Sequence, residues 1–391
     1  MTSLLVIGGG PAGAALATLL ARSGKRVTLI EREARPHDKV CGEFISGEAA
    51  AYLRGLGLDL PSLGAVAIDK VRLAARGAPV QTALPFPAFS LSRRRLDEAL
   101  LTLAADAGVE VRRGVRARGL VRSAAGWQAK LDTGEAIEAD TAFLATGKHD
   151  LKDLRRPEGL HGGLVGFKMH WRPAPHQAGA LAGTVELHLF PGGYAGLQPI
   201  EDGLINLCLV APRATVAKNG FPSLLRTMRA ACPLLDQRLT GAEPLWPKPL
   251  AVSAIPYGHV ARTADGLWRL GDQAAVIPSF AGDGLGIALH SAHAATAAYF
   301  AGEPAEAFQR RLAADLGLRV KGAALLSRLL VQPWAQPAIV ALTRLRPRLL
   351  SATAAKTRIP DQALDRLRPA PARPGTAGNI PPSGRRSDCP A

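Results

Sequence analysis

Three glycines near the start of the chain have the spacing of a phosphate-binding turn. Gly8, Gly10 and Gly13 follow a short apolar run and precede an Ala-rich segment of helical character. In the pattern G-x-G-x-x-G the first glycine permits a tight turn, the second lets a pyrophosphate approach the backbone, and the third allows close packing of helix on strand. Glu31 ends a second apolar run, where a carboxylate would accept hydrogen bonds from ribose hydroxyls. The pattern predicts a dinucleotide-binding unit.

The composition is that of an ordinary globular enzyme. Of the 391 residues, 47% are hydrophobic and 20% are charged, which is enough for two or three packed units. The formal net charge is +16, but no nucleic-acid-binding motif accompanies the basic residues. We therefore predict no nucleic-acid partner and interpret the excess as a solvated basic face, with attraction to an anionic membrane surface or to an acidic partner as the alternative.

The cysteines and the first residues of the chain indicate the cellular compartment of the protein. Four cysteines lie far apart and form no C-x-x-C pair, which predicts neither a zinc site nor a disulfide framework and indicates a reducing compartment. We predict no metal centre. The chain runs directly into an apolar strand, which leaves no room for a signal peptide, and no uncharged apolar run is long enough to cross a bilayer. These features predict a cytoplasmic protein, with association with a membrane surface left open.

Alternating helical and strand-like segments predict an α/β fold. In chain order the predicted segments are β structure over 65–91, an amphipathic helix over 93–108, a buried strand over 142–147, further β structure over 160–258 with a helix over 221–239, a helix over 287–300 and helical composition over 303–368. Residues from Pro369 on are rich in Pro, Gly, Ser and Arg, which is typical of disorder.

Three separated elements together resemble FAD-dependent oxidoreductases of the glutathione-reductase-like Rossmann class. They are the first turn with Glu31, the strand end Ala145-Thr146-Gly147, and Gly271-Asp272 before a glycine-rich helix start. Within that class the chain is most similar to the group of geranylgeranyl reductases and aromatic-ring flavin monooxygenases. The resemblance implies a Rossmann-like FAD-binding domain with an interleaved β-sheet substrate domain and C-terminal helices. The implied boundaries are 1–64, 91–159 and 259–300 for the FAD domain, 65–90 and 160–258 for the substrate domain, 301–368 for the helices and 369–391 for a disordered tail.

The resemblance also implies the residues that bind FAD. Asp272 would accept hydrogen bonds from ribityl or ribose hydroxyls, and Arg93 would lie near the cofactor. Backbone N–H groups of the late glycine cluster would approach the pyrimidine edge of the flavin, where the helix dipole stabilises negative charge. NAD(P)H is the implied electron donor, although the chain has Thr146-Gly147-Lys148 where related hydroxylases carry an Asp-Gly pair, which leaves direct nicotinamide use open. The expected cofactor contacts are Gly8, Gly10, Pro11, Ala12, Gly13, Glu31, Arg32, Cys41, Gly42, Arg93, Ala145, Thr146, Gly147, Gly271, Asp272, Gly282, Gly284, Leu285 and Gly286.

Two further segments resemble the geranylgeranyl reductases and supply catalytic candidates. The segment around Cys41 is similar to their Cys-Gly loop over the flavin, and inert packing is the alternative for this thiol. Pro191-Gly192-Gly193-Tyr194 is similar to a motif that continues Tyr-x-Trp-x-Phe-Pro in those reductases. Here Gly196 and Gln198 replace the Trp and the Phe, which widens the pocket or makes it more polar. We predict that Cys41 and Tyr194 border the substrate.

Two ionisable residues follow strand ends or glycine turns. His149 comes after the strand that ends near residue 145, where catalytic groups collect in open α/β sheets. It could carry a proton near neutral pH, and a surface loop histidine is the alternative. Asp283 lies beside the flavin-facing glycines, and its alternative role is that of a helix N-cap.

These observations predict an FAD-dependent oxidoreductase that acts on a small hydrophobic organic substrate, as geranylgeranyl reductases do. The alternatives are an FAD-dependent monooxygenase that hydroxylates an aromatic or polyketide substrate, and a flavin-binding protein without catalytic activity. The chain lacks the Trp-x-Trp-x-Ile-Pro run of flavin halogenases, which argues against halogenation. Residues 323–350 combine apolar helical stretches with arginines, as in a helix that lies on a membrane surface; packing on the FAD domain with a basic outer face is the alternative.

Overall fold

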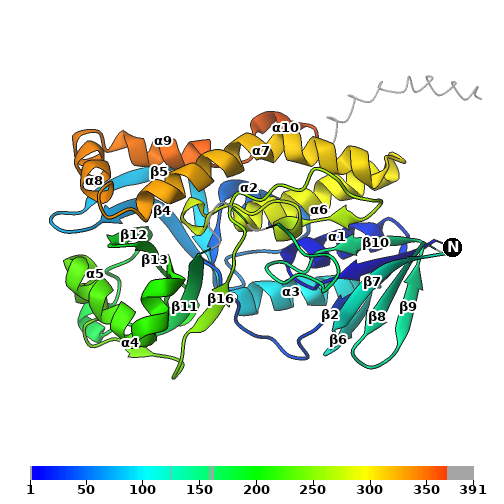
Figure 1. The fold of residues 1–391 in the computed structure, drawn as a ribbon, viewed down its shortest axis with the longest axis horizontal. Coiled ribbons are helices and arrows are strands. Elements are labelled where there is room, and N and C mark those ends of the chain that lie inside the picture. Colours follow the sequence, from blue (N-terminus) through cyan, green and yellow to red (C-terminus); the bar gives the residue numbers. More distant parts are fainter. Residues whose placement is uncertain (1, 125, 158, 160–162, 368–391) are drawn as a thin grey trace, which may run out of the picture.

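The computed structural model describes residues 2–124, 126–157, 159 and 163–367 of the chain. Two sheets lie next to each other, and the long helix α7 (Ala305–Leu330) runs across both (Figure 1). One end of α7 packs on the core of the first sheet through Phe308 and Leu312, and the other end packs over the second sheet through Leu330. The helix therefore ties the two sheets together.

The first sheet is parallel and has the strand order β17-β10-β1-β2-β6. In β1, Leu4 and Val6 belong to the core on the helical side, whereas Leu5 and Ile7 belong to the core on the opposite side. Because both faces are covered, the strand is apolar from Leu4 to Ile7. The strands are β1 (Ser3–Ile7), β2 (Arg26–Glu31), β6 (Glu110–Arg113), β10 (Thr141–Leu144) and β17 (Trp268–Arg269).

Helices cover one face of this sheet and a three-stranded meander covers the other. The helical face carries α1 (Pro11–Arg22), α3 (Arg93–Asp106) and α6 (Gly284–Phe300). The antiparallel meander consists of β7 (Ala117–Ser123), β8 (Gly126–Leu131) and β9 (Ala136–Ala139). Helix α1 follows the glycine turn directly, so its N-terminus faces the carboxyl edge of the sheet.

The second sheet is mixed, with the order β15-β11-β14-β13-β12-β4-β5-β3 and with β16 paired to β11. Strands β4 and β12 are parallel to each other, and the remaining neighbours are antiparallel. The strands are β3 (Phe44–Ile45), β4 (Val66–Ala74), β5 (Val80–Ser90), β11 (Leu164–Arg172), β12 (Thr184–Phe190), β13 (Gly193–Pro199), β14 (Ile205–Pro212), β15 (Glu243–Pro244) and β16 (Leu250–Ser253). The short helix α2 (Gly47–Gly55) follows β3.

The segment predicted as one helix over 221–239 is helical, but it is interrupted at Cys232. The structure has α4 (Arg213–Ala231) and α5 (Pro233–Leu239), with Cys232 in an extended conformation between them. The break follows from Pro233, because a proline disfavours the helical conformation of the residue before it. Both helices pack on one face of the second sheet, through Leu224 and Leu235 among others.

The other face of the second sheet is covered by the C-terminal helices. After α7 come α8 (Gln336–Leu345), α9 (Arg348–Lys356) and α10 (Asp361–Asp365), and the breaks fall near Pro333, Pro347 and Pro360. The parallel sheet, the mixed sheet and these helices confirm the predicted fold class. No helix among the described residues is long and apolar enough to cross a membrane. The predicted disordered tail lies outside the described residues.

Candidate functional site

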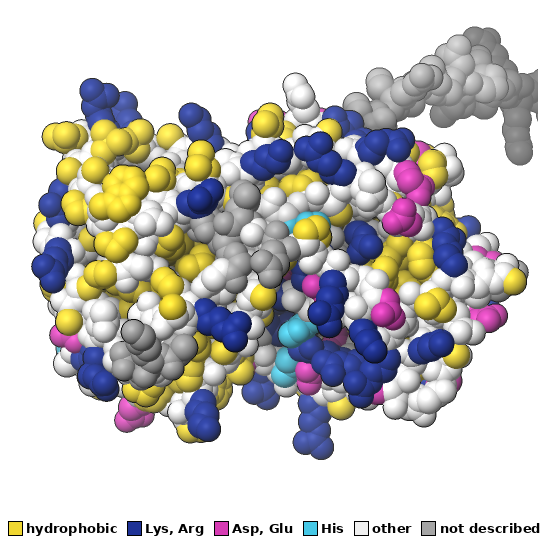
Figure 2. All heavy atoms as spheres, in the orientation of Figure 1, with side chains coloured by type: hydrophobic (Ala, Val, Ile, Leu, Met, Phe, Trp, Pro, Cys, Tyr) yellow, Lys and Arg dark blue, Asp and Glu magenta, His cyan; other side chains and the backbone are white. Residues whose placement is uncertain are grey.

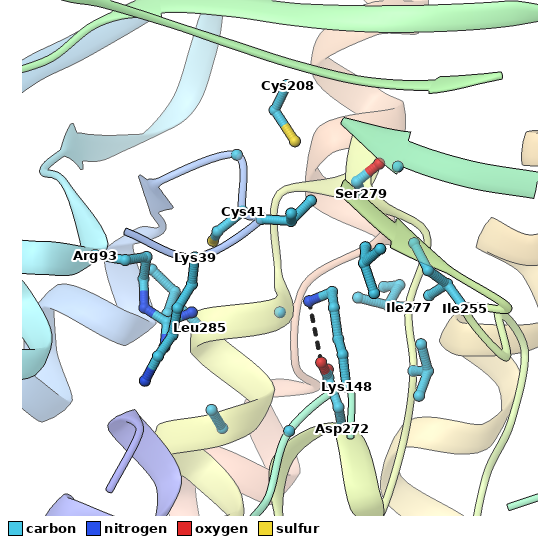
Figure 3. Close-up of a pocket in the computed structure, with 18 of the residues that line it drawn as sticks. Lys39, Cys41, Arg93, Lys148, Cys208, Ile255, Asp272, Ile277, Ser279 and Leu285 are labelled. Carbon is cyan, nitrogen blue, oxygen red and sulfur yellow. Dashed lines mark hydrogen bonds and ion pairs between the residues drawn. The ribbon is translucent and has the colours of Figure 1, made fainter. Parts of the chain in front are cut away.

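A large cavity lies between the two sheets. Its volume is about 1260 Å³, and its wall runs from the glycine turn after β1 to the inner faces of α7, α8 and α9. Figure 3 shows part of this wall, with side chains from both halves of the molecule pointing into the space. We call the part around Gly8–Gly13, Glu31 and Arg93 the nucleotide end, and the part between the second sheet and α7–α9 the chamber.

The glycine turn at the nucleotide end leaves no room for side chains at two positions. Gly8 has a φ of +110°, and a Cβ there would lie 2.4 Å from the carbonyl oxygen of Ala145. A Cβ on Gly13 would lie 1.9 Å from the carbonyl oxygen of Gly8. A Cβ on Gly10, by contrast, would meet only Arg93 Nη2 within 4 Å, at 3.5 Å. The turn is therefore tightly packed at Gly8 and Gly13 and open to the cavity at Gly10. A phosphate site at a helix N-terminus requires such an opening.

Glu31 lies at the end of β2 with its carboxylate held over this turn. Its Oε2 accepts a hydrogen bond from the Gly9 N–H at 2.8 Å, and its Oε1 accepts one from the Glu33 N–H at 3.1 Å. Only 4% of Glu31 is exposed. The next residue, Arg32, pairs with Glu33 at 3.1 Å on the cavity wall. Each Glu31 oxygen keeps a free lone pair, so the carboxylate can still accept from ribose hydroxyls.

Arg93 approaches the turn from the first residue of α3. Its guanidinium donates two hydrogen bonds to Asp97, from Nε at 2.7 Å and from Nη2 at 2.8 Å. Lys39 Nζ also donates to Asp97, at 2.9 Å. Burial raises the pKa of Asp97, but Arg93 and Lys39 outweigh it and hold the pKa below its usual range. Asp97 thus pairs with both cations, and Lys39 Nζ also lies 4.0 Å from Glu31 Oε2. These pairs hold two cations beside the turn, where a diphosphate would lie.

Lys148 and Asp272 meet at the carboxyl edge of the first sheet, because they follow the neighbouring strands β10 and β17. Lys148 Nζ lies 3.1 Å from Asp272 Oδ2 (Figure 3). Burial raises the pKa of Asp272, yet Lys148 and Arg156 hold it below its usual range, so Asp272 is an acceptor at neutral pH. The other strand-end contacts that were expected also line the cavity: Ala145, Thr146, Gly147 and Gly271.

The late glycine cluster forms the start of α6. Gly282 has a φ of +66°, and a Cβ there would meet the ring of Phe44 at 2.9 Å. A Cβ on Gly286 would lie 2.3 Å from Asp283 Oδ1, whereas nothing lies within 4 Å of one on Gly284. Gly284 and Leu285 line the cavity. The helix start therefore presents open backbone to the cavity at the place where the flavin edge is expected.

Arg358, which sequence reasoning missed, holds this helix start from the C-terminal region. Its guanidinium donates to the carbonyl oxygen of Ala281, to that of Gly282 at 3.4 Å and to Asp283 Oδ1 at 3.3 Å. Asp283 stands at the N-cap position, but its side chain makes no capping hydrogen bond; it lies with Ser46 and Arg358 instead. Burial raises the pKa of Asp283 well above its usual range. The sequence gives no specific signal for Arg358, which is one of several cations in the C-terminal region.

Cys41 lies in the loop between β2 and β3 and lines the cavity, as does Cys208 from β14 (Figure 3). Asn206 pins the loop by donating from Nδ2 to the carbonyl oxygens of Cys41, at 3.2 Å, and Gly42, at 3.0 Å. The Glu43 N–H donates to Cys41 Sγ at 3.3 Å. Burial raises the pKa of Cys208 to about 12. One thiol comes from this loop and the other from β14, and the hydrogen bonds from Asn206 fix the backbone of the loop.

Glu43 connects three parts of the molecule at this loop. Its Oε1 accepts from Lys168 Nζ and from the Arg93 N–H at 2.7 Å, and its Oε2 lies 2.7 Å from His170 Nε2. Its φ of +60° is unusual for a residue other than glycine. Burial raises the pKa of Glu43, but Lys168 and His170 outweigh it and the pKa stays low.

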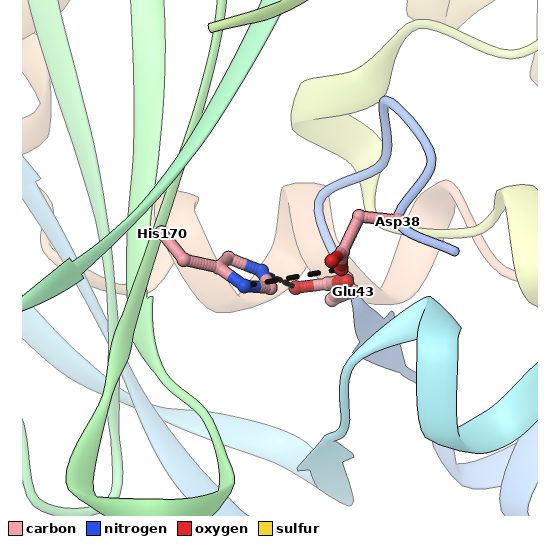
Figure 4. Close-up of side chains that lie close together, drawn as sticks. All are labelled: Asp38, Glu43 and His170. Carbon is pink, nitrogen blue, oxygen red and sulfur yellow. Dashed lines mark hydrogen bonds and ion pairs between the residues drawn. The ribbon is translucent and has the colours of Figure 1, made fainter. Parts of the chain in front are cut away.

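Asp38, Glu43 and His170 lie close enough together to hold a metal ion (Figure 4). However, Lys168 Nζ already bonds both carboxylates, at 3.3 Å for Asp38 Oδ1. Because this ammonium supplies the positive charge, we interpret the cluster as a buried ion network. Sequence reasoning missed it; the signal was Lys168, a charged residue within the buried strand β11.

Tyr194 lies on the chamber side of the cavity. Its hydroxyl is 3.3 Å from Ser279 Oγ and 3.5 Å from Ser327 Oγ. Tyr257 donates to the same Ser279 hydroxyl at 3.3 Å. Burial raises the pKa of Tyr194, and that of Tyr257 well above its usual range, so both phenols are neutral at physiological pH. They can donate hydrogen bonds but cannot act as bases.

His149 faces the cavity among cations. Burial, then Arg32, Arg116 and Lys148, lower its pKa to about 4. The imidazole is therefore neutral across the physiological range. This low pKa speaks against the predicted proton transfer by His149 near neutral pH.

The chamber is apolar except for a few polar groups. Its wall comes from the second sheet, including Val71, Leu73, Leu187 and Val210, and from the C-terminal helices, including Leu326, Leu330, Ile339 and Leu350. Gln198 is 3% exposed, lines the cavity, and its Nε2 has no hydrogen-bond partner among the described residues. A Cβ on Gly196 would meet only the Cys208 carbonyl oxygen, at 3.7 Å. The two positions that depart from the reductase motif thus supply open space and a free amide donor.

Residues 1–143 match the protein family described as FAD binding domain. The chain is an FAD-dependent flavoprotein. The halogenase PltM in complex with phloroglucinol and FAD shares the fold of this flavoprotein, with a TM-score of 0.69, 18% identity, and coverage of 84% of this chain and 76% of that chain. The turn at Gly8–Gly13, the carboxylate of Glu31 and the open start of α6 fit this cofactor, and the flavoprotein is an oxidoreductase.

Relatives of the flavoprotein have two kinds of named activity. A menaquinone reductase of Mycolicibacterium smegmatis is 25% identical over 311 residues, which is 74% of each chain. A tryptophan 2-halogenase of Chondromyces crocatus is 27% identical over 318 residues, or 76% of this chain and 60% of that protein. The chondrochloren halogenase CndH has a TM-score of 0.71 at 22% identity, covering 94% of this chain and 95% of that one. At 18% and 22% identity, the solved halogenase structures show the fold of the flavoprotein and not its reaction.

Proposed function

We propose that this flavoprotein reduces a lipophilic organic substrate with a long apolar portion, such as an isoprenoid or an isoprenoid quinone. The observation that carries the proposal is the continuous cavity, which leads from the nucleotide end and the start of α6 into the apolar chamber. A volume of about 1260 Å³ exceeds the usual range of small-molecule sites and leaves room for a second molecule beside FAD. The menaquinone reductase relative supports this substrate class.

Bound FAD supplies the electrons, and the residues of the chain bind and orient the two molecules. The glycine turn, Glu31 and Arg93 hold the adenosine diphosphate part, and Asp272 accepts from hydroxyls of the linker. On the chamber side, Gln198 lines the wall, and its buried Nε2 can turn toward a polar substrate group such as a carbonyl because it has no hydrogen-bond partner among the described residues.

Tyr194 and Cys41 border the substrate in this proposal. The neutral phenol of Tyr194 can donate a hydrogen bond, and the loop of Cys41 closes the cavity from the side of β3. Apolar walls keep water away from the substrate tail. Cys41→Ser together with Tyr194→Phe should lower turnover while FAD stays bound; unchanged turnover and substrate affinity would remove both residues from the proposal.

Anaerobic turnover tests the reaction itself. The FAD-loaded protein is reduced with NADPH, NADH or dithionite without oxygen, then mixed with an isoprenoid quinone or a polyprenyl compound. A reductase reoxidises the flavin and yields a product two hydrogens heavier by mass spectrometry. Turnover that requires oxygen and adds an oxygen atom would instead establish a monooxygenase, and turnover that also requires a halide would establish a halogenase. A full flavin spectrum without reduction by any donor would favour a non-catalytic flavin carrier.

We also propose that the basic C-terminal helices make peripheral contact with a membrane. A substrate with a long apolar chain resides in the bilayer, so the enzyme must meet it there.

A further inference from the structure

Exposed apolar side chains are concentrated on the C-terminal helices. Of the ten large hydrophobic residues that are exposed among the described residues, seven lie between residues 318 and 349. Trp334 is 73% exposed and Leu345 is 78% exposed. Figure 2 shows apolar side chains gathered at the upper left, where Figure 1 places α8. We define the docking face as Leu329, Trp334, Leu342, Leu345 and Leu349.

The same segment is strongly basic and has no acidic residue. Between residues 316 and 360 the chain has no Asp or Glu, and its cations are Arg319, Lys321, Arg328, Arg344, Arg346, Arg348, Lys356 and Arg358. Arg328, Arg346 and Arg348 are exposed, and their side chains have no hydrogen bond or ion pair among the described residues. The apolar docking face is thus bordered by Arg328, Arg346 and Arg348, which have no carboxylate partner within the described part of the chain.

Helix α8 is held firmly against the second sheet. Gln336 donates from Nε2 to the carbonyl oxygens of Phe190, at 2.8 Å, and Leu330, at 2.7 Å. At the other end of the helix, Arg344 donates to the carbonyl oxygen of Ala78 at 2.8 Å. These bonds fix the orientation of the docking face relative to the chamber.

The docking face and the chamber are two sides of the same helices. Leu326, Leu330, Ile339 and Leu350 point their side chains to the chamber, on the inner side of α7, α8 and α9. Leu349 lines the cavity and is also 39% exposed. The cavity wall therefore reaches the molecular surface within the docking face.

We propose that the docking face binds an anionic lipid bilayer and that the lipophilic substrate enters the chamber beside Leu349. The second half of this statement rests on the proposed function. Exposed Trp and Leu insert at the lipid boundary, and the arginines pair with anionic headgroups. A second copy of this chain is a poorer partner, because it would bring two sets of unpaired arginines together.

Co-sedimentation of the FAD-loaded, full-length protein with lipid vesicles tests the docking face, without donor or substrate. We expect binding to vesicles of phosphatidylcholine with phosphatidylglycerol, and much weaker binding to phosphatidylcholine alone. Arg346→Gln with Arg348→Gln should weaken binding about 30-fold, since each juxtamembrane arginine contributes roughly 1 kcal/mol. Leu342→Ser with Leu345→Ser should reduce binding to both vesicle types.

Matched controls come from the opposite end of the molecule. Arg26→Gln removes an exposed arginine at the start of β2, and Val121→Ser removes a side chain that is 39% exposed on β7. Both controls should bind vesicles as the wild type does. The proposal is overturned by absent binding to anionic vesicles, or by controls that weaken binding as much as the docking-face variants. It is also overturned by a dimer in sedimentation velocity that the two Leu variants dissociate while vesicle binding is absent.

The two proposals fail separately. If vesicles are not bound but a short-chain soluble substrate is reduced, only the docking face is wrong. If vesicles are bound but no substrate is reduced under anaerobic conditions, only the reductase activity is wrong. A docking-face variant that reduces the short-chain substrate normally but loses reduction of a vesicle-borne substrate supports entry from the bilayer.

Discussion

The nucleotide end and the chamber of this flavoprotein are built on different principles. At the nucleotide end, a Cβ added to Gly8 or Gly13 would lie 1.9 to 2.4 Å from a backbone oxygen, which makes glycine obligatory at both positions. Arg93 there pairs with Asp97 one helical turn away. In the chamber, side chains from the second sheet and from α7–α9 form the wall, and Gly196 has free space above it. One end is fixed by backbone geometry and the other by side-chain packing.

This difference indicates which end decides the specificity. The nucleotide end fits a part of FAD that is the same in every enzyme that uses it, so its geometry cannot select a substrate. The chamber can change volume or polarity with one substitution and leave the cofactor bound. Each prediction below tests whether the two ends are separable in this way.

The largest effect is expected at Gly13. Gly13→Ala places a Cβ where the carbonyl oxygen of Gly8 lies, so α1 must move away from β1. We expect a loss of at least 100-fold in FAD affinity, measured by titration of the apoprotein and by the flavin absorbance after purification. Gly55→Ala in α2, where nothing lies within 4 Å of the added Cβ, is the control. Full FAD content in Gly13→Ala would show that the turn is less rigid than its geometry indicates.

Glu43 connects the nucleotide end to the second sheet, and its replacement should lower the free energy of unfolding. Glu43→Ala leaves the fully buried Lys168 without its main partner, and breaking a buried pair costs roughly 3–5 kcal/mol. Urea denaturation measures this decrease in unfolding free energy. Glu98→Ala, which removes a partly exposed partner of Arg113, should cost about 1 kcal/mol or less. Equal costs for the two variants would contradict this connecting role of Glu43.

Filling the chamber should affect the substrate and spare the cofactor. Gly196→Leu adds a side chain in the open space near Cys208 and should raise KM for a long-chain substrate about tenfold or more. FAD affinity should stay within twofold of the wild type. The matched control Gly322→Ala lies in α7, where nothing is within 4 Å of the added Cβ. A parallel loss of FAD from Gly196→Leu would break the separation of the two ends.

Gln198 should contribute through its free amide. Gln198→Leu removes a buried donor that lacks a partner among the described residues, so we expect unchanged or higher stability. For a carbonyl substrate, KM should rise roughly tenfold, which corresponds to one lost hydrogen bond. Substrates without a carbonyl should be unaffected. The same rise in KM for both substrate types would show that Gln198 acts through packing.

The smallest effect is expected at His149. Because its pKa is about 4, His149→Asn should leave the pH dependence of kcat between pH 6 and pH 8 unchanged. Its folded pKa lies below the unfolded value of 6.5, so the unfolded state binds the proton first. Stability should therefore fall as the pH falls from about 6.5 to 4, and less steeply in the variant. If His149→Asn instead removed a change of kcat with pH near pH 7, His149 would be a proton carrier.

The sequence by itself predicted the nucleotide end. Gly8, Gly10, Gly13 and Glu31 lie within one βαβ unit, and their roles depend on local backbone conformation, which short-range spacing encodes. The fold class and the cofactor followed from the same motif together with Gly271-Asp272. The alternating strand pattern also placed a second sheet in the middle of the chain.

Only the tertiary structure decided the chamber and the ion network. Lys168, Glu43 and Arg358 are far apart in the sequence, and no periodic pattern encodes which of them meet when the sheets pack. The pKa of His149 depends on burial and on cations that include Arg32 and Arg116 from two other segments, so its type and position after a strand could not reveal it. Local motifs determine the cofactor site because backbone geometry is local; the substrate site arises from long-range packing, which the sequence specifies only through the whole fold.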